Sequence, residues 1–280
     1  MDLKLGDYNT LEVVKQVDFG VFLDGGIEGE VLLPAKSVPE GCKVGDKLEV
    51  FLYLDSEERL IATTERPYAK VGDFAYLEVA WTNRFGAFLK WGLLKDLFVP
   101  FKEQKTPMEI GKSYMVYVMV DRQSYRVMAT AKVEHHLSKE PVPYAAGDEV
   151  SVLVWAKTDL GYKVIIDNKY GGLVYDSDIF SRIQPGMRMQ AYIKQVREDG
   201  KVDVTLQPSG IGYAEDFSDT LLRKIAEAGG RMPFGDKSPA EDIYREFGVS
   251  KKVFKKAAGM LYKSRKIKID DFSIEIFNGE

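Results

Sequence analysis

A glycine pattern that occurs three times constrains the fold of this chain more than any other feature. Each copy opens on a Gly-Asp pair, at Gly6, Gly72 and Gly147, and has further glycines 14 and 39 positions later. The later glycines are Gly20, Gly86 and Gly161, followed by Gly45, Gly111 and Gly186. Because two spacings recur in three places, the sequence indicates one structural unit repeated in tandem.

Within each copy, short runs of β-branched and aromatic residues are separated by Gly and Asp turns. In the first copy these runs are Thr10–Val17, Val21–Leu23, Val31–Leu33, Leu48–Leu54 and Leu60–Thr63. Five short strands in roughly 65–75 residues are typical of a small closed barrel, the oligonucleotide-binding (OB) fold. The glycines inside the strand patterns, Gly20, Gly86 and Gly161, are expected at a bulge or a sharp bend of the barrel.

The C-terminal part has a different period. After Pro208-Ser209-Gly210 the apolar residues recur with helical spacing. Ser218 and Ser250 are expected to cap a first and a third helix, and Ser238–Glu241 has the pattern of a capping box that opens a second helix, ending at Gly248. Two strand-like runs follow, at 266–269 and 273–277. Three helices and a hairpin resemble a winged helix.

These patterns predict a mainly β protein with a small α+β domain at its C-terminal end. The expected domains are OB barrels at residues 1–66, 67–138 and 139–210, and a winged helix at 211–280. A length of 280 residues, with 45% hydrophobic and 29% charged residues, fits a globular chain of several domains. One cysteine, Cys42, excludes an internal disulfide and a site made of several thiolates.

The net charge of −4 conceals an uneven distribution. Residues 1–68 carry seven basic and fourteen acidic residues, whereas residues 69–132 carry ten basic and six acidic ones. Every charge between Glu246 and Asp270 is positive. A polyanion is therefore expected to prefer the second copy and this C-terminal stretch over the first copy.

Short motifs resemble those of the S1 domain, an RNA-binding repeat with an OB fold. Phe19–Leu23 and Phe85–Leu89 are similar to its FGAFV strand, and Val44–Asp46 to its VGD turn. Gly172–Tyr175 is similar to its GLVH strand, with Tyr175 where histidine is usual. Over its whole length the chain resembles the bacterial conserved virulence factor B family, RNA-binding regulators with three S1 domains and a winged helix.

The resemblance implies which residues contact RNA, since two phenylalanines of the second strand and the histidine of the third face the ligand in S1 domains. The implied residues are Phe19 and Phe22 in the first copy, Arg84, Phe85, Phe88 and Lys90 in the second, and Tyr162, Lys163 and Tyr175 in the third. Alternatively, each phenylalanine packs inside its own barrel and does not contact RNA. The charge favours RNA binding by the second copy and then by the third. The first copy is expected to be structural or to face a protein.

The third helix of the winged helix has a basic face, formed by Lys251, Lys252, Lys255 and Lys256. Winged helices place this helix against phosphates or base edges, so the face is expected to bind RNA or DNA. A solvated face and a protein-binding face are the alternatives.

Nothing in the sequence indicates an enzyme, a metal site or a cofactor. His135 and His136 are adjacent in a polar linker, where neighbouring side chains do not converge on one metal. The pairs Asp176/Asp178 and Asp270/Asp271 leave a magnesium-dependent nuclease as a weaker alternative.

The expected protein is a cytoplasmic, bacterial, monomeric RNA-binding protein without a membrane segment. It is expected to hold single-stranded RNA on its barrels and winged helix and, by resemblance, to regulate gene expression, including virulence, after transcription. The main alternative is a protein-interaction scaffold on the transcription or translation machinery, which would dock through the acidic first copy.

Overall fold

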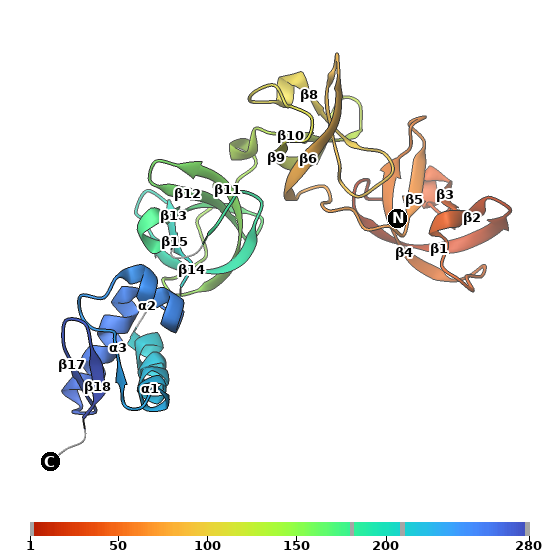
Figure 1. Ribbon diagram of the computed structural model, residues 1–280. Coiled ribbons are helices and arrows are strands. Elements are labelled where there is room, and N and C mark those ends of the chain that lie inside the picture. The colour runs from red at the N-terminus through yellow and green to blue at the C-terminus, as the bar shows by residue number, and fades with distance from the viewer. Residues whose placement is uncertain (1–2, 180–181, 208–210, 278–280) are drawn as a thin grey trace. The chain divides into compact units, whose positions relative to one another are not determined.

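The computed structural model describes residues 3–179, 182–207 and 211–277. The chain divides into two compact units, Met1–Leu137 and Ser138–Glu280, which are described separately (Figure 1). The change of period at Pro208-Ser209-Gly210 falls outside the described residues. The domain boundaries expected after residues 66, 138 and 210 stay a prediction.

The first unit begins with a closed five-stranded barrel, called the first barrel. Its strands are β1 (Tyr8–Val17), β2 (Gly20–Asp24), β3 (Glu30–Pro34), β4 (Lys47–Leu54) and β5 (Leu60–Thr63), in the order β1-β2-β3-β5-β4. Its core is made by inward-facing residues at alternating positions along the strands, among them Leu11, Val13, Leu23, Leu33 and Leu52.

The second sheet of this unit has the same strand sequence but does not close. Its strands are β6 (Phe74–Asn83), β7 (Gly86–Leu89), β8 (Leu97–Pro100), β9 (Ser113–Val120) and β10 (Val127–Thr130), in the order β10-β9-β6-β7-β8. In the first barrel, β3 pairs in parallel with β5. Within the described chain, the corresponding strands β8 and β10 form no such ladder, so the second sheet has a seam between them.

The second unit contains another closed barrel, called the third barrel, and a helical part. The barrel strands are β11 (Glu149–Thr158), β12 (Gly161–Ile166), β13 (Tyr170–Tyr175), β14 (Arg188–Val196) and β15 (Val202–Thr205). The helical part has α1 (Ile211–Glu227), β16 (Arg231–Met232), α2 (Ala240–Phe247), α3 (Lys251–Lys263), β17 (Ile267–Ile269) and β18 (Ile274–Ile276). Its three strands pair in the order β16-β18-β17, and the helices pack on a core that includes Phe254 and Leu261. The predicted fold class is confirmed: mainly β with three closed or nearly closed barrels, followed by a winged helix.

The strand glycines do not lie at a bulge, which was one of the two roles expected for them. Gly20, Gly86 and Gly161 are each the first residue of the second strand of their sheet. A Cβ atom there would lie 2.2 Å or less from a carbonyl oxygen of the third strand, so only glycine allows this close approach. The bulge lies instead in the preceding strand, where the register shifts between Val13 and Lys15 and at the equivalent places in the other copies.

Of the three predicted helix N-terminal caps, the structure contradicts two and confirms one. Ser218 lies inside α1 and donates its hydroxyl hydrogen to the carbonyl of Glu215, so it is not a cap. Ser238 accepts from the backbone N–H of Gly235, and Pro239 stands at the N-cap of α2 without a capping side chain, so the capping box is wrong. Ser250 does cap α3, accepting from the N–H of Val253 at 3.3 Å. Gly248 ends α2 in a left-handed conformation, as expected.

The first barrel and the second sheet share one apolar cluster. Phe51 of β4 packs edge-on against Trp91, with ring centroids 5.9 Å apart. Lys70 pairs with Asp7 at 3.0 Å. Burial raises the pKa of Asp7, but hydrogen bonds from Lys70 and from the N–H of Tyr8 outweigh it, so the pKa is lowered. These contacts fix the two sheets against one another within the first unit.

The two histidines differ in environment. His135 is exposed, whereas His136 is half-buried and stacks on Tyr117, with ring centroids 4.1 Å apart. His136 is thus packed against β9 and is not the solvated linker residue that the sequence predicts. In the described residues, none of the helices has the length and apolar character needed to cross a membrane.

Candidate nucleic-acid interface

Three aromatic side chains lie next to one another across the second sheet. The strand registers place Trp81 of β6 opposite Phe88 of β7, and Phe88 opposite Phe98 of β8. The rings of Trp81 and Phe88 stack in parallel at 3.7 Å and 4°, and those of Phe88 and Phe98 lie 4.9 Å apart. We call these three residues the aromatic row. It forms an apolar surface in which Trp81 is 43% exposed and Phe88 and Phe98 are half-buried.

A further pair of aromatic residues stands at one end of this surface. Phe85, in the turn between β6 and β7, is 58% exposed, and the guanidinium of Arg84 lies 4.7 Å from its ring centre. The turn is held by Asn83, whose Oδ1 accepts from the N–H of Phe85. Phe101, after β8, is also exposed, and its N–H donates to the carbonyl of Phe85. Ring faces and a cation are thus presented together to solvent.

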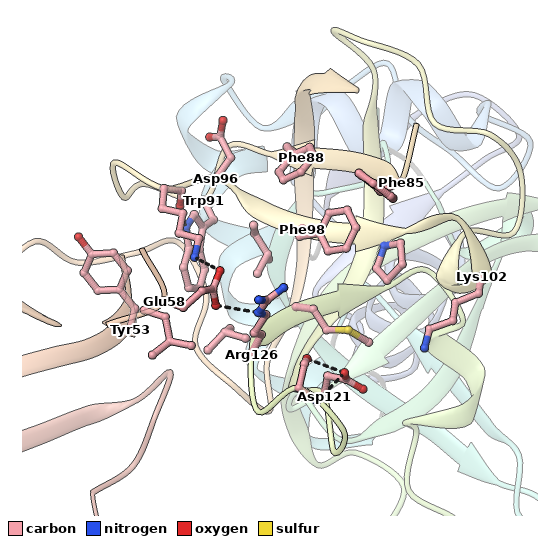
Figure 2. Close-up of a pocket in the computed structure, with 17 residues that line it drawn as sticks. Tyr53, Glu58, Phe85, Phe88, Trp91, Asp96, Phe98, Lys102, Asp121 and Arg126 are labelled. Carbon is pink, nitrogen blue, oxygen red and sulfur yellow. Dashed lines mark hydrogen bonds and ion pairs between the residues drawn. The ribbon is translucent and has the colours of Figure 1, made fainter. Parts of the chain in front are cut away.

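The aromatic surface opens into a pocket of about 610 Å³ (Figure 2). Leu97, Val127 and Met128 from both sides of the seam line it, together with Phe85, Phe88 and Phe98. Charged side chains also line the pocket: Glu58, Lys95, Asp96, Lys102, Asp121 and Arg126. An apolar wall surrounded by charges of both signs suits a flat heteroaromatic group that carries a charged backbone.

Lys90 lies apart from this pocket. Its ammonium pairs with Glu78 at 2.6 Å, and this hydrogen bond and the charge of Glu78 raise the pKa of Lys90. Lys90 is therefore cationic and already has an anionic partner, and its predicted contact with RNA stays a prediction.

The equivalent surface of the first barrel is less aromatic. Phe19 is 60% exposed and Phe22 is half-buried, and their rings meet edge-on at 6.2 Å. The neighbours of Phe22 across the strands are Lys15 and Leu32, where the second sheet has Trp81 and Phe98. The sequence-predicted pair is present, but it has no aromatic row around it.

The third barrel combines tyrosines with cations. The ammonium of Lys157 lies 4.7 Å from the ring centre of Tyr162, and that of Lys163 lies 5.0 Å from the ring centre of Trp155. Tyr175 accepts a hydrogen bond from Arg197, which also pairs with the buried carboxylate of Asp203 at 2.7 Å. The predicted Tyr162, Lys163 and Tyr175 are thus accessible or half-buried, but they are not stacked on one another.

The basic face of α3 is mostly exposed. Lys252, Lys255 and Lys256 are exposed and Lys251 is half-buried. Lys255 pairs with Asp236 at 2.8 Å. The lysines thus lie together on one helix, as the sequence predicts, with one of them neutralised within its own domain.

Sequence reasoning missed Trp81 and Phe98. Both follow from the cross-strand register of Phe88, which a motif search on one strand does not consider. A signal was available for Trp81, since it lies nine positions after Gly72, as Lys15 does after Gly6. For metals, the described residues contain no cluster of three or more His, Cys, Asp or Glu side chains in a ligating arrangement.

Comparisons with known proteins agree with this architecture. The model of the S1 domain matches residues 5–65, and the model of the CvfB-like winged helix domain matches residues 219–276. The chain is 29% identical over 272 residues to the uncharacterized protein YitL of Bacillus subtilis, covering 95% of this chain and 91% of that protein. It is 23% identical over 241 residues to conserved virulence factor B of Staphylococcus aureus, covering 84% and 80%. The chain is thus similar over most of its length to the conserved virulence factor B family.

One solved structure is similar to this chain over nearly its whole length. It is a multidomain protein with nucleic acid binding domains from Streptococcus pneumoniae, 24% identical, which covers 97% of this chain and 98% of its own, with a TM-score of 0.43. The two domain models that match this chain describe domains of nucleic-acid-binding and regulatory families. Nucleic acid is therefore the supported class of partner.

Proposed function

We propose that this protein binds single-stranded RNA, mainly on the aromatic row of its second sheet, and regulates gene expression after transcription through this binding. The observation that carries the proposal is the aromatic row, in which Trp81 stacks on Phe88 and Phe88 contacts Phe98, beside the exposed Phe85. Unpaired bases stack on such rings with about 1–3 kcal/mol per base, with little dependence on sequence.

Charge supports the same surface. Residues 69–132 have an excess of basic residues, and Arg84, Lys102 and Arg126 lie at or beside the pocket. Cations placed beside ring faces allow a strand to stack its bases while its phosphates are neutralised. Because the bases of a duplex are already stacked, the proposal includes a preference for single strands over duplexes.

The third barrel and α3 are proposed as additional contacts. Tyr162 and Tyr175 offer ring faces near Lys157 and Lys194, and Lys252 and Lys256 offer exposed charges. These contacts would add affinity that depends strongly on salt, since each neutralised phosphate releases counterions.

A matched pair of substitutions tests the proposal. Phe85→Ala and Phe19→Ala remove rings of nearly equal exposure, 58% and 60%, from equivalent turns. We expect Phe85→Ala to weaken binding of the full chain to a fluorescent oligouridylate about 5- to 150-fold, the equivalent of one lost stacking contact. Phe19→Ala is expected to change the affinity less than about twofold, because the acidic first barrel repels phosphate.

Fluorescence anisotropy gives the affinity, and the length of the RNA after incubation with and without chelator shows whether it is cut. Equal effects of the two substitutions would contradict the assignment of the second sheet. Chelator-sensitive cleavage would replace the binding proposal with a nuclease.

The regulatory part needs a measurement in cells. RNAs crosslinked to the wild-type protein are expected to change in translation or lifetime when Phe85→Ala replaces it, while their transcription stays constant. Changes in transcription alone would contradict regulation after transcription.

A further inference from the structure

The first barrel inserts a carboxylate into the charged part of the pocket on the second sheet. The hairpin between β4 and β5 carries Glu58, whose Oε2 lies 2.7 Å from Nε of Arg126 and whose Oε1 lies 3.4 Å from Nζ of Lys95. Figure 2 shows the Glu58 carboxylate joined to Arg126 by a dashed line, and both residues line the pocket. Two cations of the second sheet therefore converge on one anion that comes from another barrel.

Glu58 is the charged side chain of this hairpin that contacts cations of the second sheet. Asp55 accepts hydrogen bonds from the N–H groups of Glu57 and Arg59 and from the guanidinium of Arg59. Burial raises the pKa of Asp55, but these hydrogen bonds outweigh it and lower that pKa. Glu57 pairs with Arg59 at 3.0 Å. The other charges of the hairpin thus neutralise one another locally, and Glu58 faces the second sheet.

The two ion pairs are accessible to solvent. The side chains of Glu58 and Lys95 are each 37% exposed and that of Arg126 is 57% exposed. Exposed pairs of this kind contribute little net free energy and are screened by salt. A phosphodiester carries the same charge as a carboxylate and accepts the same hydrogen bonds from guanidinium and ammonium groups. An RNA phosphate can therefore compete with Glu58 for both cations.

We propose that Lys95 and Arg126 form a phosphodiester subsite, which the carboxylate of Glu58 fills in the RNA-free protein and which RNA takes over on binding. The subsite rests on the proposed function, because it borders the pocket that contains Phe85, Phe88 and Phe98. A base stacked on the aromatic row has its backbone within reach of these cations. The first barrel then lowers the RNA affinity of the second sheet through one side chain.

Glu58→Gln in the full chain tests this subsite, with Glu57→Gln as the matched control. Both substitutions remove one negative charge from the same hairpin, but Glu57 contacts Arg59 and not the second sheet. We expect Glu58→Gln to raise the affinity for a fluorescent oligouridylate about three- to tenfold. The slope of log K against log salt should steepen by up to about 0.7 for each phosphate that no longer has to displace the carboxylate. Glu57→Gln should change the affinity less than about twofold.

Two further variants test whether the effect of Glu58→Gln comes from the lost carboxylate and acts through Arg126. Glu58 has a positive φ of 65°, which glycine adopts freely, so Glu58→Gly removes the carboxylate without straining the hairpin and should give the same gain. Arg126→Gln should weaken binding, and adding it to Glu58→Gln should remove most of the gain. Melting temperatures establish that each variant is folded.

The outcomes distinguish a failure of the proposed subsite from a failure of the proposed RNA surface. If Phe85→Ala weakens binding but Glu58→Gln and Glu58→Gly bind with wild-type affinity and salt slope, the subsite is wrong and the surface stands. Weaker binding of the folded Glu58 variants likewise overturns the subsite, because Glu58 would then contribute to RNA binding. If neither the wild type nor the Glu58 variants bind RNA, both proposals fail.

Discussion

The first barrel and the second sheet have the same backbone plan and present different surfaces. Across the strands, the first barrel has Lys15, Phe22 and Leu32 where the second sheet has Trp81, Phe88 and Phe98. The first barrel closes through β3 and β5, whereas the second sheet leaves a seam that opens into a pocket. The first barrel therefore differs from the candidate RNA surface of the second sheet at two of the three positions of the row and in its charge.

The largest expected difference between the two sheets concerns the centre of the row. Phe88 stacks on Trp81 and contacts Phe98, so Phe88→Ala removes the ring that holds the row together. We expect RNA affinity to fall by about 1–3 kcal/mol or more, and Phe22→Ala in the first barrel to change it little. Titration of labelled RNA measures both. Phe88→Leu, which keeps an apolar side chain of similar bulk, should lose affinity with a smaller loss of stability.

The next prediction concerns what the two sheets share. Gly20→Ala and Gly86→Ala each place a Cβ about 2.2 Å from a backbone carbonyl oxygen of the neighbouring strand. Both are expected to destabilise the first unit by about 1–3 kcal/mol, as overpacked sites do. Urea denaturation measures the free energy of unfolding. A neutral effect at either position would show that the two sheets do not need the same close strand approach.

A smaller effect is expected from a single peripheral cation. Lys102 lines the pocket of the second sheet, and Lys15 occupies the row of the first barrel. Lys102→Gln should reduce the salt slope of RNA binding by about 0.7, the value for one phosphate on a single strand. Lys15→Gln should leave the slope unchanged, and an equal reduction would place phosphate on both sheets.

The smallest effect is a pH dependence confined to the second sheet. Burial, and then the charge of His135, lower the pKa of His136 below its usual 6.5. The unfolded chain therefore binds the proton more tightly, so the stability from neutral His136 is full above the unfolded pKa and is lost as pH falls. Melting temperatures at pH 7.5 and 5.5 should show a small decrease that His136→Gln abolishes. A decrease of the same size in that variant would assign it to other groups.

Sequence periodicity was sufficient for the barrels because the glycines mark places where backbones touch. Gly20 and Gly161 are required because a neighbouring strand approaches them closely. The residues that make such a contact lie within one copy of the repeat. The cap at Ser250 was predictable for the same reason, since the hydroxyl bonds to an N–H three residues away. The prediction for Ser218 was wrong because the helix that contains it begins earlier, at Ile211. In the sequence, a serine inside a helix cannot be told from a serine that caps one.

The site was only half predictable, because most of it is made between strands and between sheets. Phe85 and Phe88 follow from a motif on one strand, whereas Phe98 becomes their neighbour through register. The contact of Glu58 with Arg126 depends on how the first barrel packs on the second sheet, which no local pattern encodes. The missing β8–β10 ladder is likewise a property of the folded sheet within the described chain.

Photocrosslinking of single-stranded RNA to the full chain, with the modified residues identified by mass spectrometry, tests the central claim most directly. Adducts are expected to concentrate on the second sheet, at Trp81, Phe85 and the residues beside them, with few on Phe19 or Phe22. Adducts mainly on the first barrel, with the second sheet unmodified, would contradict it.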